Sequence, residues 1–215
     1  MLGMSLLSNA LSEMDREDRF YGVTIAEVTN NKDEAKLGRV KVKFPWLSDT
    51  DESFWARVLT PMAGGDRGMY FLPEVGDEVL VAFEHGNIEF PYILGALWNG
   101  KDKPPETNED GKNNKRTIKS RSGHTITLDD TDGEEKIEIF DKSKKNSIVM
   151  NTKENTITIS AEADITIQSS NGKLILSGKE IQLDSKGDVK IKASQNMNIE
   201  AGSQLDIKGQ MVNIN

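Results

Sequence analysis

Short apolar pairs recur through the C-terminal half of this sequence and constrain its fold more than any other feature. Each pair consists of two apolar residues on either side of a residue that is usually polar. The pairs are Ile126/Leu128, Ile137/Ile139, Ile148/Met150, Ile157/Ile159, Ile165/Ile167, Leu174/Leu176, Ile181/Leu183, Val189/Ile191, Met197/Ile199, Leu205/Ile207 and Val212/Ile214. Residues at i and i+2 share a face of a strand but not of a helix. Each pair therefore predicts a short strand with one apolar face.

The spacing of the pairs indicates a stacked architecture. Their first members lie 11, 11, 9, 8, 9, 7, 8, 8, 8 and 7 residues apart, so the chain settles into a period of about eight. Turn-forming Gly, Ser, Asn, Asp and Lys fill the intervals. In such a repeat the neighbouring units bury each other's apolar faces, which predicts a β-solenoid. A period of about eight residues fits two arrangements. In one, a single chain forms a coil with three sides per turn; in the other, several chains intertwine. We favour three chains, because isolated solenoids need polar caps and this sequence stops on a pair.

The N-terminal half predicts a small barrel. Its five strand-like segments, separated by turn residues, are FYGVTIAEV, GRVKVKF, FWARVLT, DEVLVAFEHGN and PYILGALW. In GRVKVKF the apolar residues alternate with basic ones, as in a sheet with one buried face. Five short strands in about eighty residues fit a closed barrel, of which the OB-fold is a common form.

These patterns divide the chain into four parts. We expect a short N-terminal segment at 1–18, an OB-fold domain at 19–100, a charged linker at 101–117 and a β-helix at 118–215. Within the first segment Met4, Leu7, Leu11 and Met14 have helical spacing, which predicts a short amphipathic helix, with a frayed terminus as the alternative.

Composition excludes several classes of protein. The net charge of −8 over 215 residues disfavours nucleic acid or an anionic membrane as a partner. There is no cysteine, and the two histidines are His85 and His124, which disfavours zinc sites and serine–histidine catalysis. The opening residues resemble neither a signal peptide nor a membrane span, so we expect synthesis in the cytoplasm.

Two sequence features suggest a binding site, but a structural role is favoured for each. Basic residues close to aromatic ones in the sequence would suit a groove that binds single-stranded nucleic acid. The preferred interpretation is that the aromatic residues pack in the barrel. The residues concerned are Arg39, Lys41, Lys43 and Arg57 with Phe44, Trp46, Phe54 and Trp55. LDDTDG resembles the start of a calcium loop, yet the register puts Leu128 and Ile139 where carboxylates are needed. We therefore expect an acidic turn there and predict no catalytic residue, metal site or cofactor.

Four segments carry a resemblance to a known family. In order they are GRVKVKFPW, SFWARVLTPMAGGDRGMYFLPEVGDEVLVAFEHGN, PYILGALWNGKDKPP and KSRSGHTITLDDTDGEEKIEIFD. Together they resemble the phage baseplate assembly protein V and VgrG spike family. The resemblance implies an all-β chain: an N-terminal OB-fold barrel followed by a homotrimeric triple-stranded β-helix, the central spike of a contractile injection machine.

Departures from the family pattern shape the expected partners. A full VgrG has a large hub domain before the OB-fold, where this chain has about twenty residues, so a separate hub protein is implied above the barrel. The muramidase domain and His-X-His metal apex of some phage spikes are also missing from the pattern. A PAAR-type tip protein is therefore expected at the C-terminal end. Other baseplate components and effector cargo are further expected partners.

The expected function is mechanical. The spike would connect hub to tip and pierce the target envelope when the sheath contracts, touching the target membrane transiently and catalysing no reaction. It would belong to a virion or an injection particle, with a phage tail or phage-like extracellular injector favoured over a type VI apparatus. The alternatives are a tail-associated β-solenoid that binds or depolymerises carbohydrate and, less favoured, a nucleic-acid-binding OB protein. The absence of aromatic residues from Asp141 onward argues against the carbohydrate alternative.

Overall fold

The computed structural model describes residues 19–47 and 51–214, and these are all-β apart from one short 3-10 turn. The chain forms two units, which divide between Glu162 and Ala163. The predicted N-terminal helix falls outside the described residues, and the four domain ranges stay predictions. In the part of the chain that the structure describes, no helix is long and apolar enough to cross a membrane.

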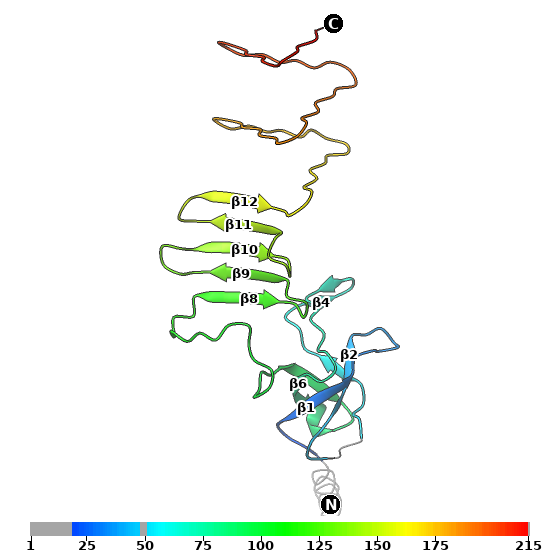
Figure 1. Ribbon diagram of the computed structural model, residues 1–215. Helices are drawn as coiled ribbons and strands as arrows, with labels where there is room; N and C mark the ends of the chain where they lie inside the picture. The colour runs from blue at the N-terminus through cyan, green and yellow to red at the C-terminus, as the bar shows by residue number, and fades with distance from the viewer. Residues whose placement is uncertain (1–18, 48–50, 215) are drawn as a thin grey trace, which may run out of the picture. The chain divides into compact units, whose positions relative to one another are not determined.

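The first unit begins with a closed barrel (Figure 1). Its strands, in barrel order, are β1 (Val23–Asn30), β2 (Arg39–Lys43), β3 (Ala56–Val58), β7 (Pro91–Ala96) and β6 (Glu78–Phe83). β3 and β7 pair in parallel, and the other neighbours pair antiparallel. Every one of the five predicted segments overlaps one of these strands, so the all-β fold with an N-terminal OB-like barrel is confirmed.

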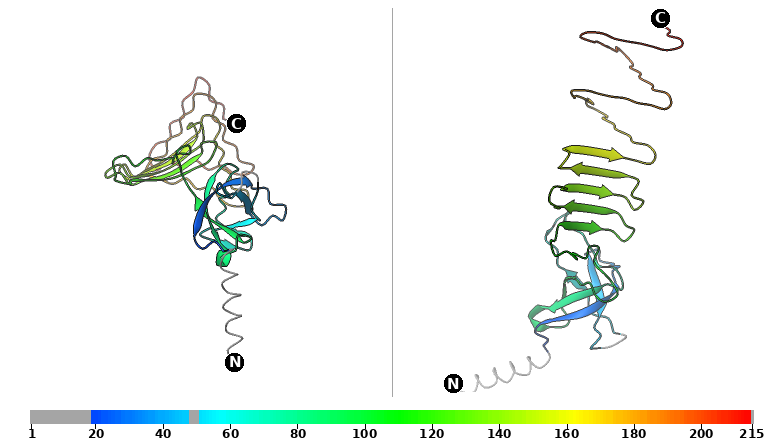
Figure 2. Two further views of the ribbon diagram at one scale, coloured as in Figure 1. Left: turned by 90° about the horizontal axis from the view of Figure 1, so that it is seen from below. Right: turned by 60° about the vertical axis from the view of Figure 1, so that its left-hand side comes forward.

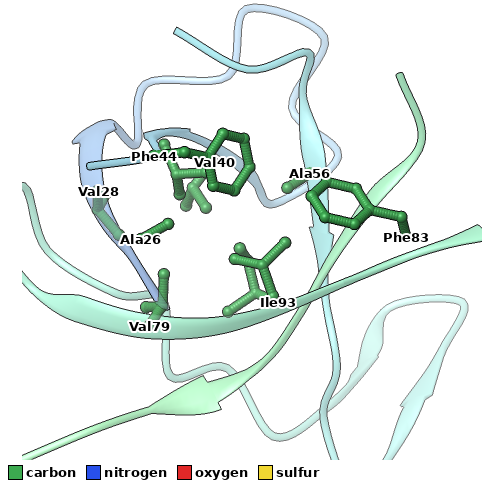
Figure 3. Packing of buried hydrophobic residues seen from close by; sticks show 10 residues of the cluster. Ala26, Val28, Val40, Phe44, Ala56, Val79, Phe83 and Ile93 are labelled. Atoms are coloured by element: carbon green, nitrogen blue, oxygen red, sulfur yellow. The ribbon is translucent and has the colours of Figure 1, made fainter. Parts of the chain in front are cut away.

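Alternation along the strands fills the barrel. In β2, Val40 and Val42 are fully buried while their basic neighbours lie on the outside. Side chains from all five strands point into this interior in Figure 3, among them Ala26, Val79 and Ile93. The barrel thus has its own hydrophobic core.

Aromatic rings close one end of this barrel. Phe20 stacks on Trp46 with 5.4 Å between centroids, and the rings of Phe44 and Phe83 lie 5.5 Å apart. Phe20 also meets Phe83 edge to face, and Trp46 Nε1 donates to Thr24 Oγ1 over 2.8 Å. The cluster fixes the chain where it enters β1.

Two small elements lie outside the barrel sheet. A ribbon of β4 (Ala63–Gly64) and β5 (Arg67–Gly68) forms between β3 and β6. The 3-10 turn η1 (Glu84–Gly86) links β6 to β7, and His85 adopts a left-handed φ of 51° in it. Both elements serve to turn the chain at the barrel rim.

After the linker the first unit continues as a five-stranded antiparallel sheet. Its strands run in sequence order: β8 (Lys115–Lys119), β9 (Thr125–Asp129), β10 (Lys136–Phe140), β11 (Ser147–Asn151) and β12 (Thr156–Ser160). Each strand pairs with the next along the chain. This corrects one expectation, since the strands of this region were predicted to pair with other chains. The wider spacing of the first apolar pairs corresponds to these hairpins.

The second unit, unlike the first, contains no paired strands among its described residues. Residues 163–214 are extended segments separated by bends, for example at 186–187, 194–195 and 202–203, and they form no strand pairing with one another. In Figure 1 this unit rises as an open coil whose successive turns lie apart. The right-hand view of Figure 2 shows the same separation, in contrast to the close spacing of β8–β12. The period of about eight is thus visible as one extended segment and one bend per repeat.

Candidate functional site

One face of the β8–β12 sheet is an apolar ladder. Cross-strand pairing joins Ile126 to Ile139, Ile139 to Ile148 and Ile148 to Ile159. A second column runs beside it through Leu128, Ile137, Met150 and Ile157. The apolar pairs seen in the sequence therefore lie in register across four strands, on a single face.

This apolar face is more exposed than the polar face behind it. Along β9 the exposed fractions are 45% for Leu128 but 8% for Asp129. Strands β10 and β11 show the same difference. Each apolar residue of a pair is exposed, whereas the residues on the other face, which are polar except for Phe140 and Val149, are half-buried. A sheet normally buries its apolar face, so a single copy of this chain lacks the surface against which the ladder packs.

The ladder also lines a shallow hollow. Its volume is about 580 Å³, and Ile126, Ile139, Ile148 and Ile159 contribute to its wall together with His124 at the rim. Polar residues also line it, among them Asp141, whose carboxylate accepts hydrogen bonds from Ser143 and Asn146. The hollow is an apolar surface suited to side-chain packing.

The opposite, polar face is held by charges and hydrogen bonds. A hydrogen bond from the Thr131 hydroxyl lowers the pKa of the Asp129 carboxyl, and the charges of Lys115 and Lys136 act in the same direction. At β8, Thr117 Oγ1 donates to Glu106 Oε1 over 2.9 Å, so the linker packs against this face. The sheet is thus fixed from its polar side, which leaves the ladder free.

Turns at the sheet edges keep the register. Asp141, between β10 and β11, accepts hydrogen bonds from Ser143 Oγ at 2.8 Å and from Asn146 Nδ2 at 2.8 Å. Led by the Ser143 hydroxyl, these bonds lower the pKa of Asp141 to about 2. A turn fixed in this way sets the pairing of β10 with β11, and a slip by one residue would move the apolar residues to the other face.

The apolar pairs continue through the second unit without any cover from their own chain. The exposed fractions are 71% for Ile191 and 63% for Ile207, and the other apolar pair members there are exposed as well. The backbone of these segments is extended and forms no strand pairing within residues 163–214. Both the apolar side chains and the hydrogen-bonding groups of this unit are therefore open to partners.

The basic residues weighed for nucleic-acid binding lie on the barrel exterior and are paired with acids. Arg39 Nε lies 2.8 Å from Asp33 Oδ2, and this guanidinium lowers the pKa of Asp33 strongly. The other pairs are Lys41 with Glu52, Lys43 with Glu27, and Arg57 with Glu84. Arg39 and Lys41 also lie over the ring of Trp55, at 5.6 and 5.5 Å.

The remaining sequence candidates have local roles in the structure. The motif LDDTDG comprises the last two residues of β9 and the start of the turn to β10, in which Asp130 pairs with Arg116. His85 accepts a hydrogen bond at its carbonyl from Arg19 over 3.0 Å. Among residues 19–47 and 51–214, no three His, Cys, Asp or Glu side chains gather as metal ligands. What sequence reasoning missed is the β8–β12 sheet within one chain, which the 11-residue spacings with polar turns signal.

Comparison with known proteins places the barrel. Residues 24–98 match the type VI secretion system/phage-baseplate injector OB domain. Over its barrel the chain is therefore similar to the baseplate and VgrG spike family. This confirms the resemblance read from the sequence motifs.

Individual relatives extend the similarity beyond the barrel. The chain is 33% identical over 126 residues to the type VI secretion system spike protein VgrG2a of Pseudomonas aeruginosa, covering 53% of this chain and 15% of the relative. It is 28% identical over 175 residues to the actin cross-linking toxin VgrG1 of Vibrio cholerae, covering 78% and 16%. It is 32% identical over 109 residues to the V. cholerae spike protein VgrG3, covering 47% and 11%. The chain thus spans less than a fifth of the length of these relatives.

Proposed function

We propose that this chain is a spike subunit of a contractile injection system. Three copies join through the apolar ladder and its continuation in residues 163–214 to form a triple-stranded β-helix. Its barrel sequence and the names of its relatives support the general role. The exposed ladder supports the assembly, and it is the observation that carries the proposal.

The argument for several copies starts from the apolar face. The ladder spans four strands, and seven further exposed pairs follow in residues 163–214. This is far more apolar surface than a soluble monomer exposes without a function. Three such faces turned toward a common axis cover one another. Each sheet then keeps its polar face outward, where the charged residues of β8–β12 already lie.

The second unit adds a backbone argument. An extended chain presents N–H and C=O groups on both sides, and these groups are nearly always paired in folded proteins. Within residues 163–214 the chain does not supply its own pairing. Strands of two further copies, inserted between successive turns, provide these hydrogen bonds and remove the open edges.

The proposed role of the rod is mechanical, without catalysis. A stack of eleven strand layers at ~4.8 Å per layer gives a rod on the order of 50 Å long. Opening one layer requires breaking hydrogen bonds and apolar contacts in several copies together, so the rod resists bending. Such a rod passes the push of a contracting sheath to the target envelope.

The setting proposed for the rod follows the sequence-based expectations. A hub protein would hold the barrels, a PAAR-type tip would cover the far end of the rod, and baseplate components and effector cargo would associate with it. The spike would assemble in the cytoplasm and act within a phage tail or injection particle.

Mass in solution tests the proposal most directly. We expect light scattering behind a sizing column to give three times the chain mass of 23.9 kDa at micromolar concentration. We also expect the trimer to persist when the sample is diluted. A soluble chain that stays monomeric under these conditions would refute the assembly, and a monomer that binds polysaccharide would favour the carbohydrate alternative.

A further inference from the structure

Charges alternate in sign along one column of the second unit. In four consecutive repeats the residue that follows the apolar pair is Asp184, Lys192, Glu200 and Lys208, each eight residues from the next. Side chains alternate between the two faces of an extended strand, so these residues lie opposite the apolar pairs. All four are exposed in the single chain.

Within one chain these four residues do not form ion pairs with one another. The ion pairs found among the described residues all lie between residues 19 and 162. Asp184 instead accepts a hydrogen bond from Gln182 Nε2 of its own repeat, over 2.6 Å. The alternation therefore has no use in the isolated chain.

The column discriminates between two ways of stacking the repeats. If one chain closed a three-sided rung, each repeat would lie beside the third repeat after it, and only Asp184 and Lys208 would meet as opposite charges. If three chains interleave, each repeat lies beside the next repeat of a neighbouring copy. Asp184 then meets Lys192, Lys192 meets Glu200, and Glu200 meets Lys208, so every contact joins opposite charges.

We propose that this column is a charge ladder between copies of the chain, which sets the register in which three chains interleave. The proposal rests on the trimer put forward above and adds its register. Apolar pairs alone define this register poorly, because all of them are similar and a slip by one repeat would still bury them. After such a slip Asp184 would face Glu200, and Lys192 would face Lys208, so like charges would oppose the slipped state.

Lys190 provides a matched control for Lys192. Both lysines lie in the same repeat, on the same face and exposed. In the interleaved arrangement the neighbours of Lys190 are Gln182 and Asn198, which are uncharged. Reversing either lysine changes the net charge of the chain equally, but only the change at Lys192 places like charges side by side.

The first experiment compares Lys192→Glu with Lys190→Glu in urea-induced dissociation of the full-length trimer. Each charge contact changed from attraction to repulsion is worth about twofold, and Lys192 makes two contacts in each of three chains, so we expect a loss on the order of 50-fold in the association constant. We expect a much smaller loss for Lys190→Glu. In 1 M NaCl, where the Debye length is about 3 Å, the difference between the two variants should largely vanish.

The second experiment inverts the whole column. The variant Asp184→Lys, Lys192→Glu, Glu200→Lys, Lys208→Glu keeps the net charge and restores alternation, so we expect it to recover the wild-type midpoint. Co-expressed with the wild type under a different tag, it should form mixed trimers less often than random mixing gives, because its charges oppose those of the wild type.

The outcomes separate this proposal from the proposed function. A wild-type monomer would overturn the trimer itself. A wild-type trimer in which Lys192→Glu and Lys190→Glu behave alike, or in which the inverted variant stays weak and mixes at random, would leave the trimer standing and overturn the charge ladder.

Discussion

Replacing Ile159 by Asp tests the apolar ladder directly, because this side chain is exposed in one chain and buried in the proposed trimer. In the single chain 58% of Ile159 remains exposed. Full burial of an isoleucine is worth about 1.5–3 kcal/mol, so covering this remainder contributes roughly 1–2 kcal/mol per chain and roughly 3–5 kcal/mol per trimer. Its loss lowers the association constant by at least on the order of 10²-fold.

The charge adds to this loss in a way that depends on pH. Three carboxylates placed together in an apolar interior repel one another and lose hydration, so the trimer raises the pKa of the introduced Asp above its value in the free chain. The charged form is the disfavoured one. We therefore expect the variant to be weakest at neutral pH and to recover part of its association as the pH falls through the raised pKa.

Thr158→Asp is the matched control, since it places the same charge on the neighbouring residue, which is also exposed but lies on the opposite face of β12. Mass measured over a dilution series gives the association constant, and circular dichroism checks that both variants keep the barrel and sheet. Equal association of the Ile159 and Thr158 variants would refute the burial of the ladder.

Three further predictions concern the first unit. Ile93→Ala, in the fully buried barrel core, should lower the free energy of unfolding by about 2–5 kcal/mol in urea titration, against a much smaller loss for the partly exposed Leu94→Ala. Gly68→Ala should destabilise the β4–β5 ribbon by about 1–3 kcal/mol, because φ is +155° and the new Cβ would lie 2.6 Å from the Met62 carbonyl oxygen; faster proteolysis of the ribbon would report this. Because the pKa of Asp141 is lowered to about 2, its carboxylate should stabilise the β10–β11 turn at pH values above its unfolded pKa of about 4. This contribution should be lost as the pH falls toward 2, which faster hydrogen exchange in the turn would report. An Asp141→Asn variant with the same acid dependence of hydrogen exchange would contradict this.

The alternation of apolar and polar residues along the strands made much of the fold predictable. Val40 and Val42 between basic residues identify β2 and its buried face, and the apolar pairs identify the face on which Ile139 and Ile148 lie. Alternation does not identify the partner of a strand's backbone, because the same pattern of side chains serves a hairpin within one chain and a pairing between chains. For that reason the sheet of β8–β12 was assigned to several chains, whereas its hydrogen bonds are internal.

Other features were beyond sequence reasoning for different physical reasons. The β4–β5 ribbon has two residues per strand and exposed side chains, so it leaves no periodic signal. The pairing of Arg39 with Asp33 depends on the path of the loop between β1 and β2, which propensities do not define. For the candidate site, the sequence supplied the apolar pairs, but only the structure shows that they are more exposed than the polar residues behind them.

The change of pairing at Glu162 and Ala163 has a consequence for how such a rod is built. The barrel and the β8–β12 sheet pair their strands within one chain, so they can fold at a rate independent of concentration. In the proposed trimer, the extended segments of residues 163–214 wait for an encounter between copies. Three prefolded sheets brought together would hold the following segments side by side, so that winding starts at one end and proceeds layer by layer. Assembly then has a direction built into the chain.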